Sequence, residues 1–345
     1  MTTDRPLTLD VTDFGPVARA CVDLRPLTVF VGPSNTGKSW LATLAYALHR
    51  YFGASQSGWQ PWFRMGPDAP ALPKGAKTHL VRIAEQLTAS APVGEPTSEG
   101  LALTRPVETA IRLYLGEQGR PLGDEVERCF GLAGDRLIRK GTEQARVLLQ
   151  LPVKGVSKPA KHELTLGDHG WTFLSTIPNG IRIRHNRYRR LFAGLLIPGR
   201  KSERWHSRRT WDAVHALALL VLPDHRPAFY LPADRTGLMN AHSAIVSTLI
   251  RSATMASIRG ADAVPPLSGV RGDFLEQLVE MVTDRWQRPR GGREHLEDVG
   301  KHIEDEILRG AVMVGTLPGV SYPHFSYRPS GWDTDLPLTN ASSMV

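Results

Sequence analysis

The sequence has few of the features that would place a protein in a membrane, outside the cell or around a structural metal. Its 345 residues include only two cysteines, Cys21 and Cys129, too few for a disulfide framework and too far apart for a zinc-binding pair. No apolar run approaches the ~18 residues of a membrane span, and the first residues lack the basic-then-apolar pattern of a signal peptide. We therefore expect a cytoplasmic protein that makes no membrane contact.

Acidic residues are also relatively scarce. Lys and Arg total 42 against 34 Asp and Glu, which gives a formal net charge of +8 at pH 7. This balance suits a polyanionic partner such as DNA, although many basic proteins bind no nucleic acid. Hydrophobic residues make up 41% of the chain, as is ordinary for a globular protein long enough to bury a sizeable core.

One stretch carries a specific chemical motif. The apolar run at residues 27–31 leads into GPSNTGKS, which fits the phosphate-binding pattern G-x-x-x-x-G-K-[ST], and apolar residues then recur at helical spacing. We predict a strand, a loop and a helix, in which backbone N–H groups and the helix dipole bind phosphate. The lysine would reach the β- and γ-phosphates and the serine would ligate Mg²⁺. The predicted ATP–Mg²⁺ site comprises Gly32, Pro33, Ser34, Asn35, Thr36, Gly37, Lys38 and Ser39, with Ser39 as the metal ligand.

Two segments resemble one family of ATPases. Residues 7–13 and 17–24 predict short strands around Phe14-Gly15-Pro16, and PLTV precedes the phosphate loop. Further on, residues 229–238 read FYLPADRTGL. Both segments are similar to the ATPases related to RecF, SMC, the OLD nucleases and ABC transporters, in which the second segment lies on the strand beside the P-loop. The resemblance implies an α/β fold: an incomplete ABC/RecF-like P-loop nucleotide-binding core with antiparallel β strands and a helical insertion.

The resemblance and the hydrophobic patterns together divide the chain into four regions. Residues 1–52 form the P-loop nucleotide-binding lobe, residues 53–142 a loop and helical insertion, residues 143–210 antiparallel strands with a basic segment, and residues 211–345 the return to the nucleotide core up to the signature segment. In the third region we predict strands at 144–151, 161–166 and 171–177, with a hairpin turn at 167–170. In the fourth we predict helices at 211–222, 239–258, 273–285 and 294–309, a buried strand at 228–231, and paired strands at 311–316 and 322–327.

Residues 181–209 are the most basic part of the chain and contain a single acid, Glu203. Arginines interleaved with Tyr188 and Trp205 suit contact with a phosphate backbone and with stacked bases. A solvated helix face beside a charged loop is the competing interpretation and the commoner origin of such a run. The nucleic-acid candidates are Arg182, Arg184, Arg187, Arg189 and Arg190.

Several polar residues resemble catalytic groups without the required context. His162 and His169 have no metal-ligand spacing, so we expect solvated strand and turn residues. Asp234 ends an apolar run, but Pro-Ala before it and Arg235 after it favour an ion pair or a loop brace over a catalytic acid. The Asp-Glu pairs at 124–125 and 305–306 lie in polar, helical patterns, so neither fits the Walker B acid, which follows an apolar strand.

Hydrolysis in the resembling family requires that missing strand and acid. The resemblance also implies that Ser342 and Ser343, in LPLTNASSMV, precede a signature helix that reaches the partner's γ-phosphate in a head-to-tail dimer, but that helix is not in the sequence. We expect binding of ATP and Mg²⁺, with hydrolysis weak or dependent on a head-to-tail homodimer or a second chain that completes the ATPase. The implied role is in DNA maintenance or phage defence. The alternative is a nucleic-acid-binding or scaffold protein with a vestigial P-loop.

Overall fold

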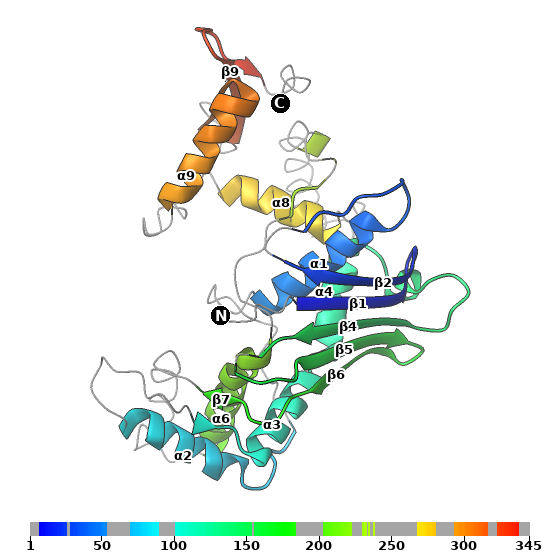
Figure 1. Ribbon diagram of the computed structural model, residues 1–345, viewed down its shortest axis with the longest axis vertical. Helices are drawn as coiled ribbons and strands as arrows, with labels where there is room; N and C mark the ends of the chain where they lie inside the picture. Colours follow the sequence, from blue (N-terminus) through cyan, green and yellow to red (C-terminus); the bar gives the residue numbers. More distant parts are fainter. Residues whose placement is uncertain are drawn as a thin grey trace, which may run out of the picture. The chain divides into compact units, whose positions relative to one another are not determined.

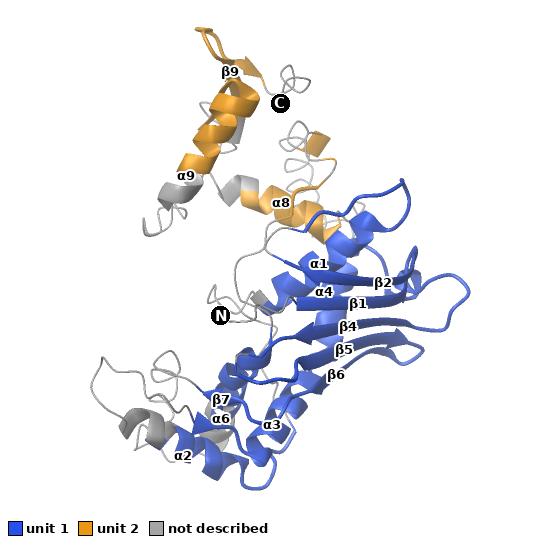
Figure 2. Cartoon of the chain, viewed as in Figure 1, with its two compact units in different colours: residues 1–228 blue, residues 229–345 orange. Residues whose placement is uncertain are grey.

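The computed structural model divides the chain into two units, residues 1–228 and 229–345 (Figure 2). The structure describes residues 7–25, 28–53, 70–89, 101–153, 155–183, 203–222, 230–232, 234, 237–238, 268–280, 293–316 and 323–337. Within these residues the chain is mixed α/β, with antiparallel sheets and several helices, as the sequence predicts at this coarse level.

A five-stranded antiparallel sheet with the order β2-β1-β4-β5-β6 organises the larger unit (Figure 1). Apolar side chains alternate along β1, β4 and β5, so one face of the sheet is buried and the other carries polar groups. The register pairs Leu9 with Leu149 and Val11 with Val147, which joins the N-terminal hairpin to strands far along the chain. The strands, all of them predicted from the sequence, are β1 (Leu7–Phe14), β2 (Val17–Leu24), β4 (Ala145–Leu151), β5 (Ala160–Gly167) and β6 (Gly170–Thr176).

Helices α1 (Lys38–Gly53), α3 (Arg105–Gly116) and α4 (Gly119–Phe130) form the layer beside this sheet. Helices α3 and α4 contact β6, and α1 packs along α4 (Figure 1). The close approach of α4 to the sheet depends on a residue without a side chain, because a Cβ built on Gly123 would lie 2.1 Å from Cγ of Trp171. A large side chain at this position of the helix would therefore separate the two layers.

Smaller elements complete the first unit. They are α2 (Ala76–Ala89), the paired strands β3 (Leu101–Ala102) and β7 (Arg182–Ile183), the 3-10 turn η2 (Gly134–Leu137), α6 (Glu203–Ala218) and the 3-10 turn η3 (Leu219–Val221). Helix α6 packs against α3, where Tyr114 stacks on Trp211 and His215. The helix predicted from residue 211 begins earlier, at Glu203. It therefore includes the last residues of the basic segment at 181–209.

The second unit contains two helical segments and a small sheet. Helix α8 (Gly269–Glu280) and helix α9 (Arg293–His302), which continues as the π-helix η5 (Ile303–Leu308), match the predicted helices where these are described. Strands β8 (Gly310–Thr316), β9 (Pro323–Pro329) and β10 (Leu336–Pro337) pair in the order β10-β9-β8, which confirms the predicted strand pair. Among the described residues, no helix is long and apolar enough to cross a membrane.

Two elements predicted on either side of residues 232–238 have different outcomes. The predicted helix at 239–258 lies outside the described residues. The predicted buried strand at 228–231 is wrong where it is described, because residues 230–231 form no strand and the Leu231 side chain is 69% exposed. An apolar run becomes a strand only when neighbouring backbone satisfies its N–H and C=O groups, and none of the described strands does so here.

Candidate nucleotide-binding loop

Residues 32–37 form the loop that precedes α1, and two of them have a backbone conformation that few residue types adopt easily. Asn35 and Gly37 have φ of +61° and +86°, in the left-handed region that asparagine and glycine tolerate best. The Thr36 hydroxyl donates to the Pro33 carbonyl (3.0 Å), and the Leu41 N–H donates to the Gly37 carbonyl (2.9 Å) as the helix begins. The loop is solvent-exposed except at Gly37, which is buried.

Lys38 folds back over the beginning of this loop. Its Nζ donates to the Pro33 carbonyl and lies 3.4 Å from Oγ1 of Thr36. Ser39 is exposed at the first turn of α1, and that turn contains no acidic residue to offset the positive end of the helix dipole. An ammonium held by neutral acceptors, an exposed hydroxyl and an uncompensated helix start form a suitable arrangement for a phosphate group and its Mg²⁺.

The turn between β1 and β2 lies directly against the loop. A Cβ built on Gly37 would lie 2.6 Å from Cγ2 of Val17, and one built on Gly15 would lie 2.2 Å from Cζ3 of Trp40. Phe14 meets the Trp40 ring edge to face, with centroids 5.7 Å apart. The Phe14-Gly15-Pro16 motif therefore supports the start of α1, a contact that the sequence did not indicate even though it singled out these residues.

The predicted strand before the loop is a second correction. Residues 28–31 form no strand and pair with none of the described strands, and the Val29 and Val31 side chains are 70% and 87% exposed. Strands of this composition are normally buried on both faces of a parallel sheet. The described sheets are all antiparallel, so they offer no such environment to this segment.

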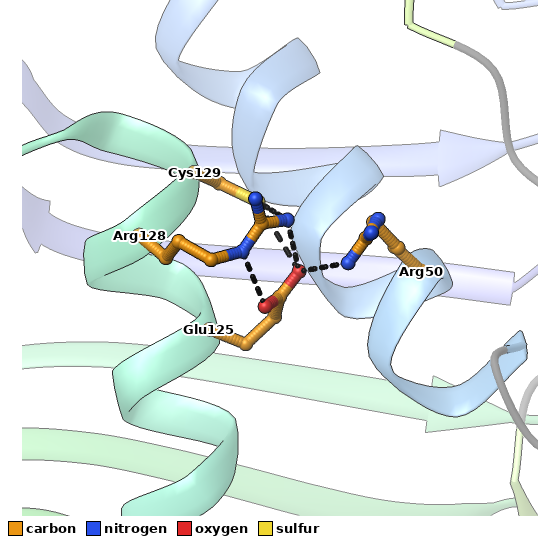
Figure 3. Close-up of polar contacts among 4 residues, drawn as sticks. All are labelled: Arg50, Glu125, Arg128 and Cys129. Atoms are coloured by element: carbon orange, nitrogen blue, oxygen red, sulfur yellow. Dashed lines mark hydrogen bonds and ion pairs between the residues drawn. The ribbon is translucent and has the colours of Figure 1, made fainter. Parts of the chain in front are cut away.

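The far end of α1 is fixed to α4 by a buried carboxylate (Figure 3). The Glu125 side chain is 2% exposed; it accepts from Nη1 of Arg50 at 3.1 Å and from Nε and Nη2 of Arg128, both at 2.8 Å. Sγ of Cys129 lies 3.5 Å from the same carboxylate. The predicted polar, helical context of Glu125 is confirmed, and the residue does not follow a strand as a Walker B acid does. Its carboxylate is buried in an ion pair between the two helices, which the sequence did not indicate.

The other residues predicted for the site are described only in part. Asp234 forms an ion pair, with Oδ2 at 2.9 Å from Nε of Arg271, while Arg235 lies outside the described residues. Arg182 is exposed on β7. Asp305 and Glu306 are exposed on η5, which confirms their helical context. The remaining candidates lie outside the described residues: Arg184, Arg187, Arg189, Arg190, Ser342 and Ser343.

The two histidines differ from each other. His169 is exposed in the β5–β6 turn, as predicted. His162 was predicted to be solvated but is fully buried: Nδ1 lies 2.9 Å from Oγ of Ser175, and Nε2 lies 2.5 Å from the Val221 carbonyl. Burial lowers the pKa of His162 to about 4. His162 lies at an inward-facing position of β5. The alternation of apolar and polar residues along the strand could have indicated that its side chain faces the core.

Comparison with known proteins adds no relative. No protein-family model matches the chain, and no curated protein matches it. In the part of the chain that the structure describes, no group of three or more His, Cys, Asp or Glu side chains is arranged to hold a metal ion. The loop at residues 32–39 and its immediate surroundings are therefore the features that indicate a function.

Proposed function

We propose that this chain binds ATP with Mg²⁺ at residues 32–39, as part of a P-loop ATPase of the RecF/SMC/OLD-like kind. The observation that carries the proposal is the combination of a complete sequence motif with a loop whose lysine turns inward over it. Within this proposal, the antiparallel sheet and α1 are parts of an ABC/RecF-like nucleotide-binding core.

Each residue of the loop has a defined task in this proposal. The N–H groups that end the loop and begin α1 bind the phosphate oxygens, with the helix dipole adding to the attraction. Lys38 exchanges the Pro33 carbonyl for the β- and γ-phosphates, and the Ser39 hydroxyl takes one coordination position of the Mg²⁺ that accompanies the nucleotide. The bound Mg²⁺ would neutralise phosphate charge.

Hydrolysis requires a further acid that these 345 residues do not provide in a recognisable context. Neither Asp-Glu pair follows an apolar strand, and Glu125 is already committed to two arginines. We therefore propose weak or partner-dependent hydrolysis, with the partner either a second copy in a head-to-tail dimer or a different chain. The exposed valines at 29 and 31 support a partner, because an apolar segment that pairs with none of the described strands is a natural place for a strand from another chain to pair.

Nucleotide binding by the Lys38→Ala variant tests the proposal. Equilibrium dialysis should give Mg²⁺-dependent binding of ATP by the wild type and at least a tenfold weaker affinity in Lys38→Ala, about the effect of removing one charged phosphate contact. Lys77→Ala, which removes an exposed lysine from α2, is the matched control and should bind as the wild type does. Equal binding by all three proteins would refute the proposal.

Phosphate release separates binding from hydrolysis. We expect little turnover by the chain alone, so rapid turnover that Lys38→Ala abolishes would contradict the proposed dependence on a partner. Salt-dependent DNA binding that survives Lys38→Ala, but not the loss of Arg187, Arg189 and Arg190, would instead support the nucleic-acid-binding or scaffold function with a vestigial P-loop.

A further inference from the structure

The segment that follows η2 carries a cation, Arg139, to the β1–β2 turn, which packs on the end of the candidate phosphate loop. It runs antiparallel to the β1–β2 turn: Ile138 bridges Phe14, the Gly15 N–H donates to the Leu137 carbonyl at 2.7 Å, and the Arg139 N–H donates to the Asp13 carbonyl at 2.9 Å. These backbone contacts fix the position of Arg139 relative to the turn. The segment is far from the P-loop in the sequence and belongs to none of the motifs recognised there.

The Arg139 side chain reaches across this turn. Its Nη1 donates to the Pro16 carbonyl at 2.9 Å, and the ring of Pro16 lies on Gly37, where a Cβ would be 3.5 Å from Cγ of the proline. Only one of the donors on the guanidinium is used in this contact. Arg139 forms no ion pair with any carboxylate of the described residues, and its side chain is half-buried.

The contacts of the β1–β2 turn indicate which phosphates this cation would meet. Lys38 lies over Pro33 and Thr36, and a P-loop lysine meets the β- and γ-phosphates. The β1–β2 turn instead contacts Gly37 and Trp40, where the loop ends and α1 begins. The backbone N–H groups of a P-loop bind the α- and β-phosphates, so a cation held at this turn would meet those two phosphates.

We propose that Arg139 is a further nucleotide-binding residue that pairs with the α- or β-phosphate of the bound nucleoside di- or triphosphate. The proposal rests on the function proposed above and adds a residue that no motif indicated. The Pro16 carbonyl orients the guanidinium, and the remaining N–H groups bind phosphate oxygens. Because ATP and ADP share these two phosphates, the contact strengthens the binding of both and does not distinguish between them.

Arg139→Gln is the decisive variant, because glutamine keeps the aliphatic stem and a polar end and loses the charge and the Nη1 donor. We expect it to weaken the binding of ATP and of ADP by the same factor, about tenfold or more. Arg136→Gln removes an exposed arginine from η2 and should change either affinity less than about twofold. Arg139→Lys should fall between the wild type and Arg139→Gln, because it keeps the charge and loses the planar fork.

The outcomes separate this inference from the proposed function. If wild-type binding occurs and depends on Lys38, but Arg139→Gln binds as Arg136→Gln does, only the Arg139 proposal is wrong. A loss confined to ATP would place the contact at the γ-phosphate and overturn the assignment to the phosphates that ATP and ADP share. A loss of binding together with a thermal midpoint more than about 4 °C below that of Arg136→Gln, without nucleotide, would make Arg139 a support for the turn instead of a ligand. If the wild type binds no ATP, both proposals fail.

Discussion

Mild acid should destabilise the larger unit through protonation of His162. This imidazole is fully buried, and burial lowers its pKa from an ordinary 6.5 to about 4 even though the Val221 carbonyl favours the protonated form. In the unfolded chain the same group binds a proton near pH 6.5, so between these two values the unfolded state holds more protons. The free energy of unfolding therefore falls as pH falls: by about 2 kcal/mol between pH 7 and pH 5, and by roughly 3 kcal/mol at pH 4.

Urea denaturation at a series of pH values measures this loss. His162→Gln removes the titrating group, so its free energy of unfolding should fall about 2 kcal/mol less between pH 7 and pH 5 than that of the wild type, whatever its stability at pH 7. His169→Gln, in the exposed turn, should keep the wild-type dependence. If His162→Gln and the wild type lose the same free energy over this interval, the assignment of the acid sensitivity to His162 is refuted.

Two further predictions concern the packing of α4. Glu125→Gln should lower the free energy of unfolding, measured by urea titration, by about 2 kcal/mol. This is less than the roughly 3–5 kcal/mol lost when a fully buried pair is broken, because the two arginine partners are 29% and 35% exposed and can be hydrated. Asp124→Asn, on the exposed side of the helix, should change the free energy of unfolding by less than about 0.5 kcal/mol. Gly123→Ala should lower the thermal midpoint, because the new methyl group would lie 2.1 Å from Trp171, whereas a Cβ on Gly116 meets nothing closer than 3.9 Å and Gly116→Ala should not lower it.

Elements with local signals were predictable from the sequence. The strands of the five-stranded sheet, the hairpin turn at residues 167–170 and the strand pair in the second unit all follow from alternation and turn residues. The candidate phosphate-binding motif was recognisable for the same reason, because it occupies eight consecutive residues. In each case the residues that decide the structure are neighbours in the sequence.

Features that depend on distant partners were not predictable. The run at 28–31 has the composition of a buried strand, but its conformation depends on whether another strand lies beside it. Glu125 is on a polar-looking helix, and only the packing of α4 on α1 brings Arg50 to it. Burial of His162 likewise requires the chain to return at Val221, far along the sequence from β5.

The contacts of α1 fix the end of the candidate nucleotide-binding loop, whereas the segment before the loop has no strand partner among the described residues. The end of the loop is fixed by the β1–β2 turn at Gly37 and Trp40, and the far end of α1 is held by Glu125. The segment that leads into the loop, residues 28–31, pairs with none of the described strands. If a partner strand covers the exposed valines, it also fixes the beginning of the loop. Nucleotide binding then loses less conformational entropy, because that segment is already ordered. By linkage, the bound nucleotide must strengthen the partner's binding by the same factor, so the proposed partner and the proposed ATP site should be coupled even before any hydrolysis occurs.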